Sequence, residues 1–171
     1  HGKTMIQRVY EQAIQSSSLD ELVVATDDQR IFDEVMRFGG KAMMTSPDHR
    51  NGTERCAEVA RVKDSFDYII NIQGDEPQIH PDQITILANM LDGDVELATL
   101  VKPITELEEL DDPGEMKVIF NQQNEAIYFS RTCVPYLRDV DKSDRLKAHN
   151  YYKHIGIYAY RNDILQQIVK L

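Results

Sequence analysis

The chain has 171 residues, of which 42% are hydrophobic and only 8 are glycine and 6 proline. This composition excludes a collagen-like or low-complexity polypeptide and predicts one globular domain with a buried core. The formal net charge of −10, from 29 acidic and 19 basic residues, excludes broad binding to nucleic acid, because the surface as a whole repels a phosphate backbone. A single phosphorylated ligand remains compatible with this charge where a metal ion or a few basic side chains neutralise it.

Neither a membrane-spanning segment nor a secretory signal is visible in the sequence. No run of about 18 apolar residues occurs, and the N-terminus lacks a charged segment followed by an apolar stretch. The two cysteines, Cys56 and Cys133, are too few for a disulfide framework and lie among apolar neighbours. We therefore expect a protein of the cytoplasm with no membrane partner. Because the chain starts at His1 without a Met and ends at Leu171 within a helical pattern, we expect both ends to be cut.

Helical and strand patterns alternate along the first half of the chain. Helices are indicated by apolar residues three and four positions apart, and strands by short β-branched runs that end in polar residues. This order predicts right-handed crossovers and a mostly parallel sheet with helices on both faces. The predicted helices cover 2–17, 29–38 with Asp28 as N-cap, a segment that begins near Thr53, and 81–91, and the predicted strands cover 21–27, 41–45 and 67–73.

The pattern changes in the second half, where a strand at 97–102 is followed by a predicted hairpin of 116–120 and 126–130. A further strand over 154–161 and a last helix capped by Asn162 complete the elements. The charged segment between Thr132 and Tyr151 is most simply a solvated loop. We predict an α/β fold: a three-layer, Rossmann-like, mostly parallel sheet with an inserted antiparallel hairpin.

The segment Gln73-Gly74-Asp75-Glu76-Pro77 leaves the carboxyl end of a predicted central strand. Ligands of open α/β sheets bind at such ends, and here a glycine allows close backbone approach beside two carboxylates. Hard oxygen ligands of this kind suit Mg²⁺, which one or two carboxylates commonly hold together with substrate phosphates. The alternative is that Asp75 and Glu76 are only turn residues and that Pro77 closes the turn.

A Gly52-Thr53 step enters the next helix, preceded by Asn51 and followed by Arg55 one turn in. The N-terminus of a helix favours anions, and Arg55 would add a charge-assisted hydrogen bond. The alternative is that Thr53 is a plain N-cap with Glu54 in the first turn. The segment therefore indicates an anion site or an ordinary helix start.

Polar residues also follow three other strands. Asp27 ends a strand of the same predicted sheet and is expected on the same edge as Gln73; the alternative is that Asp28, or Asp28 together with Asp27, only caps the next helix. Arg131, at the end of the hairpin, is suited to clamp a carboxylate with two hydrogen bonds. His154 and Tyr158 are suited to bind hydroxyl groups, although a lone histidine before an apolar strand is more often structural.

These motifs, in this order and spacing, closely resemble the 3-deoxy-manno-octulosonate cytidylyltransferases, which are sugar nucleotidyltransferases. The resemblance runs over the whole chain, and five ordered motifs make it far more specific than any one of them. It implies the nucleotide-diphospho-sugar transferase type of fold. The matching segments are ATD at 25–27, His49 with GTER at 52–55, QGDEP at 73–77, YFSR at 128–131 and HIGIY at 154–158.

The resemblance implies a reaction in which the anomeric hydroxyl of the eight-carbon acid sugar Kdo attacks the α-phosphorus of CTP. CMP-Kdo for lipopolysaccharide biosynthesis forms, pyrophosphate leaves, and Mg²⁺ offsets the charge of the triphosphate. It also implies a homodimer whose contact comes largely from the hairpin. The implied site residues are Asp75 as Mg²⁺ ligand, Asp75 and Arg131 as catalytic residues, Asn51, Gly52, Thr53, Arg55 and Gln73 on the CTP side, and Gln73, Arg131, His154 and Tyr158 on the Kdo side.

The sequence also departs from the family pattern. The family opens with a strand and a basic, glycine-rich triphosphate loop, and ends with an acidic helix and a second Asp for Mg²⁺, whereas this chain begins at about the end of that loop. We therefore expect residues 1–171 to form a single cytidylyltransferase domain without those segments. Asn51 stands where Ser is common. Two alternatives follow: a related sialic acid cytidylyltransferase, or an inactive remnant that only binds or dimerises.

Overall fold

The computed structural model describes residues 2–171, which form two compact units. Unit 1 comprises the residues up to Ala98 together with Ile157–Leu171, and unit 2 comprises Thr99–Gly156. β4 (Leu97–Pro103) and β7 (Tyr152–Arg161) each contribute residues to both units. A single domain over 1–171 stays a prediction. No helix in the described part of the chain is long and apolar enough to cross a membrane.

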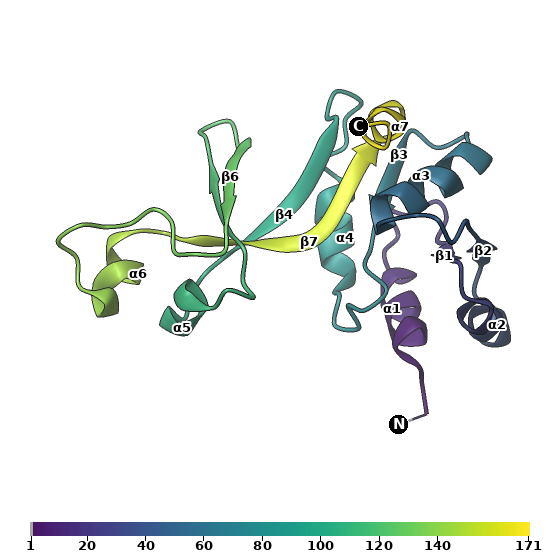
Figure 1. The fold of residues 1–171 in the computed structure, drawn as a ribbon, viewed down its shortest axis with the longest axis horizontal. Coiled ribbons are helices and arrows are strands. Elements are labelled where there is room, and N and C mark those ends of the chain that lie inside the picture. The colour runs from purple at the N-terminus through teal and green to yellow at the C-terminus, as the bar shows by residue number, and fades with distance from the viewer. Residues whose placement is uncertain (1) are drawn as a thin grey trace. The chain divides into compact units, whose positions relative to one another are not determined.

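Unit 1 alternates helices and strands as predicted, with shorter elements than the sequence pattern indicated (Figure 1). The predicted N-cap Asp28 is confirmed, since its Oδ1 accepts a hydrogen bond from the backbone N–H of Arg30 at 2.8 Å. Pro81 occupies the first turn of its helix, as expected. The elements before β4 are α1 (Met5–Ala13), β1 (Val24–Thr26), α2 (Gln29–Arg37), β2 (Ala42–Met44), α3 (Gly52–Val62), β3 (Tyr68–Asn71) and α4 (Pro81–Ala88).

The strands of unit 1 belong to two sheets. β1 and β2 pair in parallel, from Val24 with Ala42 to Thr26 with Met44. β3 pairs with β7 in the antiparallel sense, from Tyr68 with Arg161 to Asn71 with Tyr158. The predicted α/β class is confirmed, but parallel pairing is limited to β1 and β2 among the described pairs, because β3 takes as its neighbour a strand that returns from unit 2.

The core of unit 1 forms where α3 and α7 (Asn162–Ile168) lie side by side against β3 and β7 (Figure 1). Ala57 and Ala60 of α3 are buried against Tyr160 of β7 and Leu165 of α7, and Ile69 of β3 packs onto this cluster. The small alanine side chains let the two helices approach closely. This packing fixes the first turn of α3, which carries several predicted site residues.

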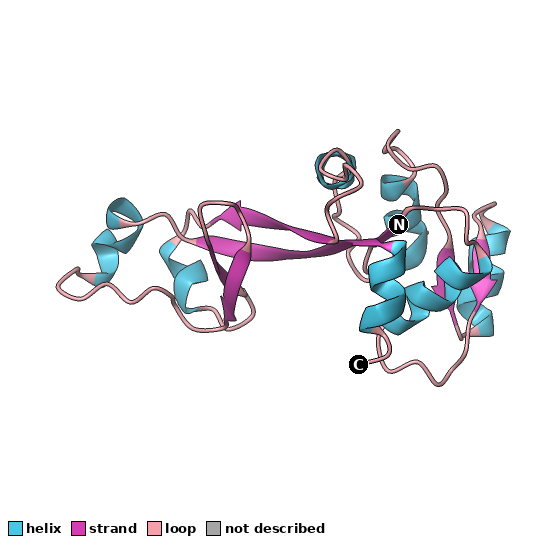
Figure 2. Ribbon diagram, turned by 90° about the horizontal axis from the view of Figure 1, so that it is seen from above, coloured by secondary structure: helices cyan, strands magenta, loops and turns pink. Residues whose placement is uncertain are grey.

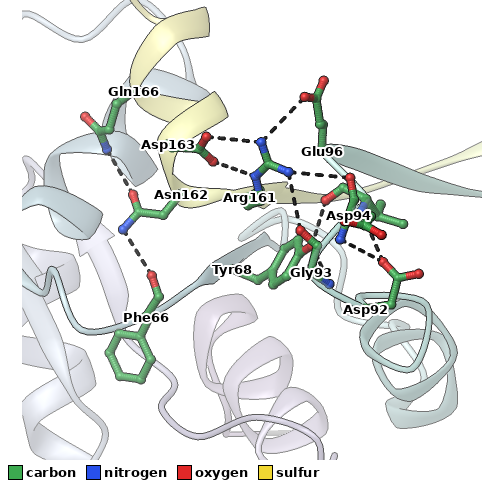
Figure 3. Close-up of polar contacts among 11 residues, drawn as sticks. Phe66, Tyr68, Asp92, Gly93, Asp94, Glu96, Arg161, Asn162, Asp163 and Gln166 are labelled. Atoms are coloured by element: carbon green, nitrogen blue, oxygen red, sulfur yellow. Dashed lines mark hydrogen bonds and ion pairs between the residues drawn. The ribbon is translucent and has the colours of Figure 1, made fainter.

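The start of α7 corrects one prediction. The N-cap is Arg161 rather than Asn162, whose side-chain amide instead donates to the carbonyl of Phe66 at 3.1 Å (Figure 3). The guanidinium of Arg161 binds the Asp163 carboxylate at 2.7 and 3.1 Å and the Gly93 carbonyl at 3.3 Å. These bonds tie the end of β7 to the connection before β4 and hold β7 in register beside β3.

Unit 2 contains the predicted hairpin of β5 (Lys117–Phe120) and β6 (Ala126–Ser130) (Figure 2, strands in magenta). Its turn is closed by a backbone hydrogen bond from the N–H of Asn121 to the carbonyl of Glu125 at 2.9 Å. The α-helix α5 (Leu107–Asp111) precedes the hairpin. Hairpin formation from two β-rich runs separated by a polar segment is thereby confirmed.

The segment predicted as a solvated loop, between Thr132 and Tyr151, is more ordered than expected. It includes a 3₁₀ turn, η1 (Lys142–Asp144), and a short helix, α6 (Arg145–Ala148). Apolar side chains within this charged segment cause the difference, because they pack on the small core of unit 2. That core contains Ile104, Leu110 and Tyr151, with Cys133, Leu137 and Leu146 packed against it.

Candidate active site

A cavity of about 260 Å³ in unit 1 lies where the ends of β1 and β3 meet the first turn of α3. Ala25 of β1 and Asn71 of β3 line this cavity, together with Gln73 and Gly74, which follow β3. β1 and β3 belong to different sheets, so the prediction that Asp27 and Gln73 follow strands of one sheet is wrong, although residues of both strands line this cavity. The apolar part of the wall is formed by Ile6, Val9, Tyr10, Ala13, Leu22, Val23, Val24, Cys56, Ile70 and Ile72.

Arg55 provides the positive charge of this cavity. Its Nη1 donates to Thr45 Oγ1 at 2.5 Å, and its Nη2 lies 3.2 Å from Asp27 Oδ1. Thr45 follows β2 and Asp27 follows β1, so the guanidinium joins two strand ends to α3. The Arg55 side chain is 19% exposed, which leaves part of it accessible to a ligand. Asp27 therefore orients Arg55, whereas the neighbouring Asp28 caps α2.

The first turn of α3 differs from the prediction in its cap. Asn51, not Thr53, is the N-cap, because Asn51 Oδ1 accepts a hydrogen bond from the N–H of Glu54 at 2.9 Å. The Thr53 hydroxyl instead lies 3.4 Å from the hydroxyl of Tyr160. The Glu54 carboxylate accepts hydrogen bonds from the backbone and side chain of Arg50, and the backbone bond is the largest cause of its lowered pKa. Gly52 begins the helix and lines the cavity.

The segment after β3 turns sharply. The N–H of Glu76 donates to the carbonyl of Gln73 at 3.3 Å, which closes a turn over Gly74 and Asp75. Gln73 is half-buried in the cavity wall, whereas Asp75 and Glu76 are exposed. Within residues 2–171, the Asp75 carboxylate has no hydrogen-bond or ion-pair partner, so it is available to a ligand.

The described residues hold no group of three or more His, Cys, Asp and Glu side chains that could bind a metal by themselves. This finding fits the kind of site expected for Mg²⁺, which keeps several waters and takes one or two carboxylates plus substrate phosphates. Asp75, exposed and without a protein partner, has the donor chemistry for such a role. The residues therefore fit a metal ion held jointly with a phosphorylated ligand.

Arg131 lies in unit 2, directly after β6, and is exposed. Its Nη1 donates to the carbonyl of Pro113 at 2.7 Å, in the turn that precedes β5. One carbonyl acceptor leaves the other guanidinium donors available for a carboxylate, the ligand with which arginine forms paired hydrogen bonds. The position of the side chain thus depends on the turn around Pro113.

His154 also lies in unit 2, on β7. Its Nε2 is 2.8 Å from Thr99 Oγ1, its backbone N–H donates to the carbonyl of Met116 at 2.7 Å, and its ring meets the Phe129 ring edge-on at 5.5 Å. Burial lowers the pKa of His154, which favours a neutral imidazole at neutral pH. Within the chain, the ring bonds the hydroxyl of Thr99, and the predicted bond to a sugar hydroxyl stays a prediction.

Tyr158 lies on β7 within unit 1, opposite Asn71 of β3. Its ring stacks with that of Tyr160 at 6.1 Å, and burial raises the pKa of its hydroxyl. The structure therefore places Arg131 and His154 in unit 2, and every other predicted site residue in unit 1.

Sequence reasoning missed two kinds of residue around the site. Asn71 is 7% exposed and lines the cavity, and the only signal for it was a polar residue inside an otherwise apolar strand. Lys117 and Lys153 are buried at 0% and 9% exposure, whereas lysine in a sequence ordinarily indicates a solvated position. Their burial becomes apparent only from the fold.

The cytidylyltransferase family model matches residues 1–171. The chain is 54% identical to the 3-deoxy-manno-octulosonate cytidylyltransferase of Cytophaga hutchinsonii and 49% identical to that of Bacteroides thetaiotaomicron. The two alignments include 100% and 99% of this chain, and 69% of the length of each relative. A CMP:2-keto-3-deoxy-manno-octonic acid synthetase, solved in complex with CTP, matches with a TM-score of 0.89 and 44% identity over 99% of this chain and 68% of its own. The chain therefore belongs to the cytidylyltransferase family, among the 3-deoxy-manno-octulosonate cytidylyltransferases.

Proposed function

We propose that the protein transfers CMP from CTP to the anomeric hydroxyl of Kdo, with release of pyrophosphate. The observation that carries this proposal is the TM-score of 0.89, at 44% identity, to a synthetase for the same acid sugar solved with CTP. In the reaction, the anomeric hydroxyl loses its proton, its oxygen bonds to the α-phosphorus, and the bond from that phosphorus to pyrophosphate breaks. The product serves lipopolysaccharide biosynthesis in the cytoplasm.

CTP binds in unit 1, at the cavity between the ends of β1 and β3 and the first turn of α3. Gln73 and Gly52 contact the nucleotide from the cavity wall, and the N-terminal turn of α3 favours its negative charge, because unpaired backbone N–H groups point out of a helix start. Asn51 and Thr53 hold this turn through the cap and through Tyr160. Arg55, already oriented by Asp27 and Thr45, contributes the cationic group.

Asp75 would hold Mg²⁺ together with the phosphates of CTP, because its carboxylate is exposed beside the cavity wall and has no protein partner among the described residues. The ion would offset negative charge on the triphosphate and on the departing pyrophosphate. The chain's own residues orient the nucleotide. A protein with a net charge of −10 needs such local cations to accept a triphosphate.

Kdo is an anion with several hydroxyl groups, and the two kinds of group require different partners. Arg131 binds the carboxylate, because its guanidinium is exposed and only one of its donors is used by Pro113. His154, kept neutral by burial, binds a hydroxyl group without repelling or attracting the carboxylate strongly. Gln73 and Tyr158 supply the remaining hydrogen bonds.

The assay that tests this function is pyrophosphate release from CTP and Mg²⁺ with Kdo or with sialic acid. We expect release with Kdo and background release with sialic acid. The reverse preference would favour the sialic acid alternative. If residues 1–171 release none while a version that carries the flanking segments of the Cytophaga hutchinsonii relative does, the inactive remnant is supported; no release from either would refute the proposal.

The protein also forms a homodimer through β6 in this proposal. β6 is the last strand of its sheet and pairs only with β5 among the described strands, and three large apolar side chains on it are exposed: Ile127 at 65%, Tyr128 at 58% and Phe129 at 40%. An apolar edge strand is a template for association. We expect a dimer in sedimentation analysis and a monomer for Ile127→Lys. A monomeric wild type would contradict the dimer.

A further inference from the structure

Lys117, the first residue of β5, is a fully buried lysine. Its ammonium group donates to three backbone carbonyls: Asp112 at 2.6 Å, Glu115 at 2.9 Å and, more weakly, Arg131 at 3.5 Å. Three acceptors match the three protons of an ammonium group. A buried charge is costly unless it is hydrogen-bonded, so these bonds compensate the burial of Lys117.

The three carbonyls come from two segments that both determine where Arg131 lies. One is the carbonyl of Arg131 itself, at the end of β6. The other two belong to the turn before β5, and that turn supplies the Pro113 carbonyl that accepts the Arg131 guanidinium at 2.7 Å. Lys117 therefore fixes the backbone of Arg131 and also the acceptor that orients its side chain.

A second buried lysine supports the same turn by different chemistry. Lys153 pairs with Lys117 across β5 and β7, and its Nζ binds Glu109 Oε1 at 2.5 Å and Glu115 Oε1 at 2.8 Å. Its partners are carboxylates, whereas those of Lys117 are carbonyls. Of the two lysines, Lys117 is the one that contacts Arg131 directly.

We propose that Lys117 is a positioning residue that holds Arg131 in the geometry needed to bind the carboxylate of the acid sugar. The inference rests on the proposed role of Arg131. Most other side chains of similar length cannot replace an ammonium group here, since Met has no donor and the Arg guanidinium is larger and planar. Loss of Lys117 leaves the carbonyls without their donor and frees the turn that orients Arg131.

The experiment compares Lys117→Met with Val118→Ala in the full chain. Val118 is the next residue on β5 and is buried at 4% exposure, so its truncation also destabilises unit 2 while leaving the contacts of Arg131 unchanged. We expect Lys117→Met to raise the KM for Kdo about tenfold, since bonds that involve charged groups contribute on this scale, and to leave the KM for CTP within about twofold. Val118→Ala should leave both KM values unchanged. An equal rise of both KM values in Lys117→Met, or none, would overturn the proposal.

A double-mutant cycle separates positioning from general damage. In an Arg131→Ala background, Lys117→Met should not raise the KM for Kdo further, because its effect passes through a side chain that is already absent. Independent effects that add would show that Lys117 does not act through Arg131. Should Lys117→Met fail to fold, Lys117→Arg is used instead, since it keeps the charge but changes the donor geometry. We expect it to raise the KM for Kdo by a smaller factor and to leave the KM for CTP unchanged.

A measurement without turnover distinguishes this proposal from the proposed function. The ¹⁵N relaxation of the Arg131 Nε–H group reports how firmly the guanidinium is held. We expect an ordered group in the wild type and in Val118→Ala, and a more mobile one in Lys117→Met. If neither the wild type nor the version with the flanking segments turns over Kdo but this difference is seen, the proposed function is wrong and Lys117 still positions Arg131. Equal mobility in all three proteins would refute the positioning role, whatever the activity.

Discussion

The two units hold their candidate site residues in different ways. In unit 1, Ala25, Gln73 and Gly74 lie together because β1 and the segment after β3 both line the cavity beside the first turn of α3. In unit 2, Arg131 lies where a buried lysine and a turn carbonyl place it. A site built on strand ends tolerates changes in its surroundings, whereas one built on buried polar contacts depends on each of them. We therefore expect substitution of Arg55 in unit 1 to affect CTP, and substitution of Arg131 in unit 2 to affect Kdo.

The largest expected effect is that of Asp75→Asn. Loss of the carboxylate should lower kcat about 1000-fold or more, because removal of a group that stabilises charge in the transition state costs on this scale. Unfolding should not change, since Asp75 is exposed and its carboxylate forms no hydrogen bond or ion pair within residues 2–171. Pyrophosphate release and thermal melting check both parts. Glu76→Gln, at the next exposed position of the same turn, is the matched control and should retain activity; equal losses in both variants would contradict the assignment of Asp75.

Arg131→Ala tests the unit 2 half of the comparison. Loss of a guanidinium that binds a carboxylate should raise the KM for Kdo about 100-fold, as expected for paired charge-assisted hydrogen bonds, and leave the KM for CTP within about twofold. Steady-state kinetics with each substrate varied in turn measures the two KM values. Arg138→Ala is the control, because Arg138 is an exposed arginine of the same unit whose one ion pair among the described residues is with its neighbour Asp139. A rise in the KM for CTP alone would reverse the comparison.

Arg55→Ala tests the unit 1 half with a smaller expected effect. The KM for CTP should rise about tenfold, and the free energy of unfolding should fall by about 1 kcal/mol as the bonds to Thr45 and Asp27 are lost. The KM for Kdo should stay within about twofold. Arg50→Ala, which removes an exposed partner of Glu54 at the same helix start, should change neither KM. A selective effect of Arg55→Ala on Kdo would break the division between the units.

The sequence predicted the site of unit 1 better than that of unit 2, for a physical reason. Strands and helices are encoded by local periodicity, so the strand that Gln73 follows and the helix whose first turn carries Arg55 can be predicted from the sequence. The burial of Lys117 is not encoded locally, because its acceptors belong to a turn and to Arg131 on the next strand. In the amino-acid sequence, a buried lysine cannot be distinguished from a solvated one.

The residues that cap the helices were also difficult to predict from the sequence. Asn51 and Thr53 both belong to the residue types that cap helices, and so does Asn162. Which of them caps depends on where the first turn begins, and that is decided by tertiary contacts such as Thr53 with Tyr160 and Asn162 with Phe66. Boundaries differed from prediction by up to four residues, as at the end of α1, although every predicted element was found.

The smallest expected effect is the pH dependence contributed by His154 of unit 2. Burial lowers the pKa of His154 below its ordinary value of 6.5. As the pH falls through about 6.5, the unfolded chain takes up a proton there before the folded protein does, so acidification lowers the free energy of unfolding. His154→Gln removes this uptake and should lose less stability than wild type between about pH 7.5 and 5.5, measured by urea unfolding. The exposed His149 provides the control variant, His149→Gln. If both variants alter the pH dependence of the unfolding free energy equally, burial of the His154 ring is not the cause of that dependence.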